Sequence, residues 1–250
     1  MPYYTYAFAR NGNGLGQRYL IITDRQETAD FIYRGLSQNE DPHFTGLERV
    51  SPQMWLWNRG RIQDLVRDIN RGGVFPVVSS LHQAKGKVLV QVLPKADNGA
   101  AFPILPNNDS VDYIGGRTFF IRNKMNPQLF WYYGEDNNFI TASTRYRSGF
   151  LIQPSSGPGT VMVDADRVEL YVYGSQTQQR IGNGQNFLST VDNNFTFPFG
   201  ALKFRFFVTA AGTIAAGGGG GGVAAPAGDR ITWSGNSSSD NPADIWEVYR

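Results

Sequence analysis

The half of the chain that follows Arg117 consists of short strand-like segments whose order recurs. Polar turns such as NKMNPQ and EDNN separate the segments, which is typical of β-strands. The first set reads TFFIRN, LFWYYG, FITAST and GFLIQ, the second TVMVDA, VELYVYG, NFLSTV and FTFPFG, and the third LKFRFFVTA, TIAA, RITWSG and DIWEVY. No helical periodicity interrupts them, so this half is expected to be all-β.

The last strand of each set repeats one feature in particular. Two large apolar residues stand two positions apart, and because alternate residues of a strand point to opposite faces, both face the same side. Three units of about 40–50 residues with four strands each predict a pseudo-symmetric barrel of the β-trefoil kind. A β-sandwich is the alternative. The paired residues are Phe150 and Ile152, Phe197 and Phe199, and Trp246 and Val248.

The first part of the chain predicts a mixture of helix and strand. RYLIIT and KVLVQVL are typical strands, whereas RIQDLVRDINRG places apolar residues at spacings of three and four and ends at two glycines. ETADFIYRGL, Glu27 to Leu36, could begin as a short helix. The region between Pro94 and Gly116 is rich in Pro, Asn and Gly and lacks periodicity, as a linker does. We therefore expect a small α+β domain over residues 1–110 and a β-trefoil-like domain over residues 111–250, with a glycine-rich insertion at 212–228.

The composition excludes several classes of chemistry. The chain has no cysteine, which rules out disulfides and thiolate sites, and only two histidines, and we predict no metal site. Its net charge of +2 comes from interspersed signs, so nucleic acid is not an expected partner. No segment is apolar enough to span a membrane and the N-terminus lacks a signal peptide, so we expect cytoplasmic synthesis; export by a non-classical route stays open.

Three motifs in the first part belong together. FIYRGLSQNEDPHFTGLERVSP contains Tyr-Arg-Gly, GGVFPVVSS ends in two serines, and SLHQAKGKVLVQVLP follows them. From Phe31 to Pro94 this order resembles ADP-ribosyltransferase-type toxin domains, in which one strand ends in Tyr-Arg and a later strand ends in Ser-Thr-Ser. The resemblance implies NAD as the cofactor, with Arg34 contacting its phosphates and Ser79 or Ser80 supporting the active-site strand.

The catalytic acid of that family has no obvious counterpart here. Those enzymes place a glutamate after the serine strand, but in this sequence none follows the serines until Glu135, which lies in a turn. Glu169 is the acid to expect if a transferase fold extends into the β region. The alternatives are an inactive relative, and an Arg34 that merely ends a strand and is solvated or paired with a nearby acid.

An aromatic cluster is the best candidate for a ligand site in the β half. LFWYYGEDNN sets Trp131 and Tyr133 on one face of a strand and follows them with Asp136, Asn137 and Asn138 in a turn. A flat aromatic ring can cover the apolar face of a pyranose while acid and amide groups bind its hydroxyls. Packing in the core is the competing interpretation for either ring.

The surrounding segment, IRNKMNPQLFWYYGEDNNFITASTRYRSGFLI, resembles the repeats of trefoil lectins and related trefoil proteins. The Gln-x-Trp signature of ricin-type repeats is absent, which leaves other glycans and proteins as ligands. From the sequence we favour non-catalytic recognition of a glycan or protein by the β domain, in a toxin- or defence-related setting and without a cofactor. The alternative is an NAD-dependent ADP-ribosyltransferase-type toxin that uses Arg34 and a distant glutamate.

Overall fold

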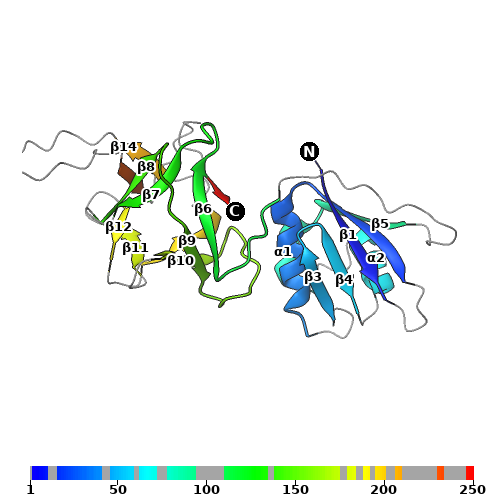
Figure 1. Cartoon of the computed structure of the whole chain (residues 1–250). Helices are drawn as coiled ribbons and strands as arrows, with labels where there is room; N and C mark the ends of the chain where they lie inside the picture. The colour runs from blue at the N-terminus through cyan, green and yellow to red at the C-terminus, as the bar shows by residue number, and fades with distance from the viewer. Residues whose placement is uncertain are drawn as a thin grey trace, which may run out of the picture. The chain divides into compact units, whose positions relative to one another are not determined.

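A computed structural model of the chain shows two compact units, Met1–Asp112 and Tyr113–Arg250 (Figure 1). The division lies close to the boundary expected between residues 110 and 111. The residues that the structure describes are 2–10, 16–40, 46–58, 62–71, 78–93, 110–134, 138–174, 179–183, 188–191, 195–200, 206–209, 230–233 and 246–250.

Unit 1 combines a mixed sheet with helices. Its strands are β1 (Tyr3–Ala9), β2 (Gln17–Thr23), β3 (Leu47–Ser51), β4 (Met54–Trp57) and β5 (Val88–Leu93), and its helices are α1 (Gln26–Ser37), α2 (Ile62–Arg71) and the 3-10 helix η1 (Ser79–Ala84). The strands lie in the order β3-β4-β1-β2-β5, with β1 and β4 parallel and the other neighbours antiparallel. The expected helix in RIQDLVRDINRG and the expected strands in RYLIIT and KVLVQVL are confirmed as α2, β2 and β5.

The segment FIYRGLSQ lies in α1 and not at the end of a strand, which corrects the expectation attached to Arg34. Ala29, Ile32 and Leu36 recur at spacings of three and four and are all buried, so one face of a helix meets the core. That buried stripe outweighs the strand propensity of Phe, Ile and Tyr, because strand propensity depends on context. Both α1 and α2 pack on the same face of the sheet, since side chains of each meet the same residues of β2, β4 and β5.

Unit 2 is built from strands. These are β6 (Arg117–Asn123), β7 (Phe130–Gly134), β8 (Phe139–Ser143), β9 (Phe150–Pro154), β10 (Arg167–Val172), β11 (Arg180–Asn183), β12 (Leu188–Thr190), β13 (Phe197–Pro198), β14 (Phe206–Thr209), β15 (Arg230–Trp233) and β16 (Trp246–Tyr249). Seven of them pair in a closed barrel, in the order β6-β7-β8-β12-β11-β10-β9 and back to β6. The chain is thus β-rich, with a barrel in one unit and a mixed sheet in the other.

The strand pairings of unit 2 recur along the chain. Hairpin pairs are formed by β7 with β8, by β11 with β12 and by β14 with β15. The first strand of a set pairs with the last, as β6 does with β9 and β10 with β13. Successive sets are joined in the same manner, because β9 pairs with β10 and the final strand β16 returns to β6.

The second set differs from the sequence expectation in two strands. TVMVDA does not form a strand, and its Val161 makes only an isolated β-bridge to Ile114. The strand in its place is β11, whose sequence RIGN has little strand character. Gly182 is required there, because a Cβ atom would lie 2.5 Å from a methyl group of Val191. The expected strand TIAA and the glycine-rich insertion at 212–228 lie outside the described residues.

The core of unit 2 confirms the alternation seen in the last strand of each set. The aromatic and aliphatic residues expected to face one side are all buried. Two of them pack against Trp131, whose ring meets those of Phe150 and Trp246 edge-on, with centroids 5.9 and 6.0 Å away. The residues concerned are Phe150, Ile152, Phe197, Phe199, Trp246 and Val248.

Candidate functional site

Arg34 occupies the last turn of α1. A basic side chain is favoured there, because it lies at the negative end of the helix dipole. α1 packs against η1, the short helix that begins at Ser79 and Ser80, so two of the expected transferase motifs belong to neighbouring elements of unit 1. Both motifs are helical, whereas the enzymes that they resemble in sequence carry them at strand ends.

Glu169, the acid expected to complete that site, lies on β10 of unit 2 in a closed polar group. The Tyr171 hydroxyl donates to Glu169 Oε2 at 2.5 Å, and Arg180 Nη2 donates to the Tyr171 oxygen at 2.9 Å. Arg180 Nη2 also lies 3.4 Å from Glu169 Oε1. Burial and the hydrogen bond to Glu169 raise the pKa of Tyr171. These contacts join the three side chains and tie β10 to β11, which is a structural role.

The buried charges of unit 1 are centred on a different arginine, Arg49 of β3. Its side chain is 4% exposed and that of Asp30 on α1 is 2% exposed. Arg49 Nη1 donates to Asp30 Oδ1 at 2.6 Å, while its Nη2 lies 3.1 Å from Asp112 Oδ1 in an ion pair without hydrogen-bond geometry. Burial raises the pKa of Asp30 to about 6, although Arg49 and a hydrogen bond from Gln26 lower it.

This buried group fastens the last residues of unit 1. Gln26 donates from Nε2 to the Val111 carbonyl at 2.7 Å and to Asp30 Oδ2 at 3.2 Å. Together with the ion pair between Arg49 and Asp112, these contacts hold the end of the unit against α1 and β3. Two carboxylates already face the guanidinium, so Arg49 is not placed to receive the oxyanion of a ligand.

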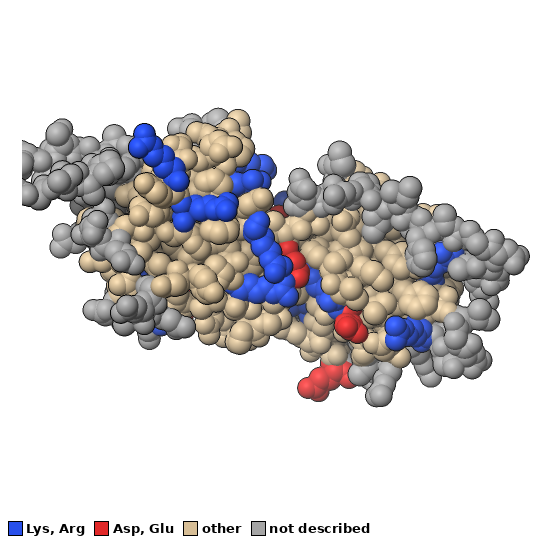
Figure 2. All heavy atoms as spheres, viewed as in Figure 1, with Lys and Arg blue, Asp and Glu red and all other residues tan. Residues whose placement is uncertain are grey.

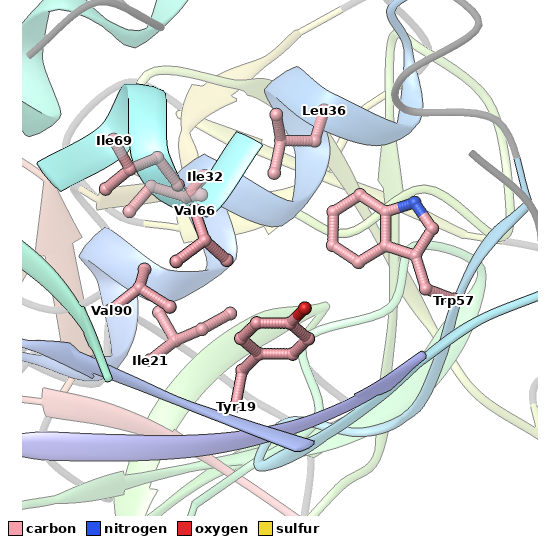
Figure 3. Close-up of a pocket in the computed structure, with 8 residues that line it drawn as sticks. All are labelled: Tyr19, Ile21, Ile32, Leu36, Trp57, Val66, Ile69 and Val90. Carbon is pink, nitrogen blue, oxygen red and sulfur yellow. The ribbon is translucent and has the colours of Figure 1, made fainter. Parts of the chain in front are cut away.

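The cavity inside unit 1 is too small for a ligand. Figure 3 shows side chains from α1, α2 and three strands pointing into one space. The room open to a water-sized sphere is about 10 Å³, roughly that of one water molecule, and its lining is apolar. We therefore regard it as a packing gap of the core. The lining residues are Tyr19, Ile21, Ile32, Leu36, Trp57, Val66, Ile69 and Val90.

Trp131 and Tyr133 of β7 point into unit 2, which corrects the expectation that they form a platform for a sugar. Trp131 is completely buried and Tyr133 nearly so. The Tyr133 hydroxyl donates to Asn138 Oδ1 at 2.8 Å, so these two candidates do meet, in a contact that braces the turn after β7. Asn138 adopts a φ of 57°, which Asn tolerates better than most residues. Asp136 and Asn137 lie outside the described residues.

The opposite face of β7 carries a surface that the sequence did not single out. Tyr146, in the loop between β8 and β9, is 61% exposed, and its ring lies 5.2 Å from that of Tyr132 at a tilt of 34°. Next to it, the Arg147 guanidinium lies over the ring of Phe120 at 4.5 Å and near that of Phe130 at 5.8 Å. We call this the Arg145–Arg147 surface; it comprises Arg145, Tyr146 and Arg147 of the loop and the three rings beneath them.

Hydrogen bonds fix the loop that presents this surface. Ser143 Oγ accepts from the backbone N–H groups of Arg145 and Tyr146, at 3.2 and 3.0 Å. At the other end, the Ser148 N–H donates to the Trp131 carbonyl at 3.0 Å, and Ser148 Oγ accepts from the Tyr133 N–H at 2.9 Å. Because both ends are braced, the loop backbone loses less conformational freedom when the loop binds a ligand.

A second stacked arginine lies on the neighbouring strands. Arg122 of β6 lies 3.9 Å from the ring centroid of Tyr249 and donates to Glu247 Oε1 at 2.5 Å. Figure 2 shows several Lys and Arg side chains close together on the visible face of unit 2. Arg122 is therefore neutralised by an acid. Among the described residues, neither Arg145 nor Arg147 has an ion pair, so the charges of these two arginines are not neutralised in the same way.

The sequence patterns did not identify two sets of residues, for different reasons. Tyr146 had a usable signal, because turns favour small or polar residues and TRYRS places a large ring between two arginines. Arg49 and Asp30 had none, because their contact joins a strand to a helix far away in the sequence.

The described residues contain no group of His, Asp and Glu side chains that could hold a metal ion. None of the described helices is long and apolar enough to cross a membrane. Comparisons of the chain with protein-family models, with curated proteins and with solved structures find no match.

Proposed function

We propose that unit 2 is a β-trefoil and that the protein is a non-catalytic binding protein, which recognises a glycan through this unit. The recurring strand pairings support the trefoil. Three hairpins are expected to close one end of such a barrel, and β8 pairs with strands of both other hairpins, β12 and β15. A sandwich would instead divide these strands between two sheets.

The observation that carries the binding role is the exposed Tyr146 ring, held against Tyr132 by a hydrogen-bonded loop. A large aromatic ring that stays on the surface does not contribute the hydrophobic stabilisation that its burial would provide. A flat ring fixed in one orientation can cover the apolar face of a sugar, and the neighbouring arginines supply hydrogen-bond donors for its oxygens. In this proposal the sugar platform is Tyr146, on the other face of β7 from Trp131.

A glycan array probed with the full chain tests the proposal. We expect binding to a subset of glycans, lost on Tyr146→Ala and kept on Tyr146→Phe, because phenylalanine preserves the ring. Trp131→Phe is unsuitable as a binding test, since Trp131 supports the core of the unit. Binding that is indifferent to Tyr146→Ala, or no binding to any glycan, would reject a glycan site at this surface.

A further inference from the structure

The Arg145–Arg147 surface carries positive charge that its own neighbours do not neutralise. Between Arg117 and Arg147 the sequence holds five basic residues, at 117, 122, 124, 145 and 147, and two acidic ones, at 135 and 136. Glu247, on the strand β16 that pairs with β6, is already bound to Arg122. The guanidinium groups of Arg145 and Arg147 are therefore available to an anion.

The geometry of Arg147 suits an oxyanion. Its guanidinium carbon lies 4.5 Å from the centroid of the Phe120 ring, a cation–π contact that restrains the group. A restrained planar guanidinium still presents N–H donors along its edge, and these match the spacing of two oxygens on a carboxylate or sulfate. Arg145 precedes it in the same braced loop and can add a second positive charge.

The exposed ring lies between these two arginines in the chain. A sugar stacked on Tyr146 would carry its substituents toward Arg145 or Arg147, because all three belong to one short loop. We propose that the ligand is an acidic saccharide, whose carboxylate or sulfate group is bound by Arg147 and Arg145 while a pyranose ring stacks on Tyr146. This inference rests on the proposed glycan-binding function and names its ligand class.

The size of the surface favours a saccharide over a nucleic acid. Single-stranded nucleic acid offers a phosphate at every nucleotide, and its binding proteins use a basic groove with several stacking rings in succession. Within the loop, the exposed ring of Tyr146 is flanked by two arginines, which matches one sugar with one or two anionic groups, and among the described residues near the loop the other exposed ring is that of Tyr173, whose N–H donates to the Gly149 carbonyl. A sulfate or carboxylate group also suits arginine, whose bidentate geometry lysine lacks.

The experiment compares a sulfated heparin-type tetrasaccharide with the same tetrasaccharide after chemical desulfation, using calorimetry on the full chain. We expect the sulfated probe to bind at least tenfold more tightly, and we expect added salt to weaken this binding, because charged contacts at the surface are screened. Arg147→Ala should weaken binding of the sulfated probe about tenfold. Arg147→Lys should weaken it less, because lysine keeps the charge but lacks the planar fork of arginine. The double variant Arg145→Ala/Arg147→Ala should lose about a hundredfold.

A matched control removes the same two charges elsewhere. Lys85→Ala/Lys87→Ala acts on exposed residues of unit 1 and should leave binding unchanged. Equal binding of both tetrasaccharides, with loss only on Tyr146→Ala, would overturn the acidic ligand and leave glycan binding standing. Equal or tighter binding of a single-stranded oligonucleotide of matched charge would overturn the saccharide. An absence of binding to all saccharides would reject both proposals.

Discussion

Arg49 in unit 1 and Arg147 in unit 2 place the same guanidinium group in opposite surroundings. Arg49 is almost completely buried between Asp30 and Asp112, whereas Arg147 lies on the surface over Phe120 and has no carboxylate beside it among the described residues. A buried ion must be paired, because desolvation of an unpaired charge is very costly. An exposed arginine that lies over an aromatic ring keeps guanidinium N–H groups that can donate hydrogen bonds to a ligand. Thus the first arginine is expected to govern stability and the second to govern binding.

Removal of Arg49 should have the largest effect. Arg49→Ala leaves Asp30 as a buried carboxylate without its cation, which is expected to cost about 3–5 kcal/mol in the free energy of unfolding. Urea unfolding of the full chain, followed by circular dichroism, measures this loss. The control Arg67→Ala removes an exposed arginine from α2, where its contact with Asp68 is solvated, and should cost less than about 1 kcal/mol. Equal small losses would show that the buried pair does not stabilise unit 1.

Stability should next depend on pH through Asp30. Its pKa is raised from 3.8 to about 6 in the folded protein, chiefly by burial, so the folded state holds the proton more tightly than the unfolded chain. Protonation of Asp30 therefore favours folding below pH 4, and this contribution is lost as the pH rises through about 6. The loss is on the order of 1–3 kcal/mol.

The same unfolding experiment between pH 4 and pH 7 measures this effect. Asp30→Asn cannot titrate, so the difference in unfolding free energy between the parent and the variant should change across that range. The parent should lose stability relative to the variant as the pH rises. A constant difference would mean that the carboxylate keeps an ordinary pKa and that Arg49 compensates fully for its burial.

Arg147→Ala should have a small effect on the stability of the protein and a larger effect on ligand binding. Arg147→Ala removes a cation–π contact at the surface, which is expected to cost about 0.5–1 kcal/mol in unfolding free energy. The same change should weaken the sulfated tetrasaccharide about tenfold. Thermal unfolding and calorimetry on one preparation compare the two effects. A loss of stability as large as that of Arg49→Ala would make Arg147 a structural residue and remove the contrast.

The smallest effect should come from Arg34. Arg34→Ala removes a cation from the last turn of α1, where such charges contribute about 0.3–1 kcal/mol. The same variant addresses the transferase alternative, because an NAD site at Arg34 would raise the melting temperature of the parent in the presence of NAD and not that of the variant. We expect NAD to shift neither melting temperature.

Prediction from the sequence succeeded where short-range periodicity decides the structure. The alternation in FTFPFG and DIWEVY predicted Phe197, Phe199, Trp246 and Val248 as residues of one face, and all are buried. The same alternation separated Trp131 and Tyr133 from Tyr132 correctly, but it did not reveal which face meets the core. The wider segment ETADFIYRGL could begin as a short helix and does lie in α1, whereas the reading of Arg34 as a strand end, taken from FIYRGLSQ alone, is wrong, because the spacing of buried residues extends to Ala29, outside that motif.

The sequence by itself determined that a mixed α+β region precedes a repetitive β region, because apolar periodicity is a local property of the chain. Only the tertiary structure decided which arginine is buried and which is exposed, since Arg49 meets Asp30 and Arg147 meets Phe120 across long sequence separations. It also decided that Trp131 fills the core while Tyr146 lies on the surface. The physical reason is that the burial of a side chain depends on which strands pair. Strand pairing in turn depends on many weak contacts spread over the whole unit.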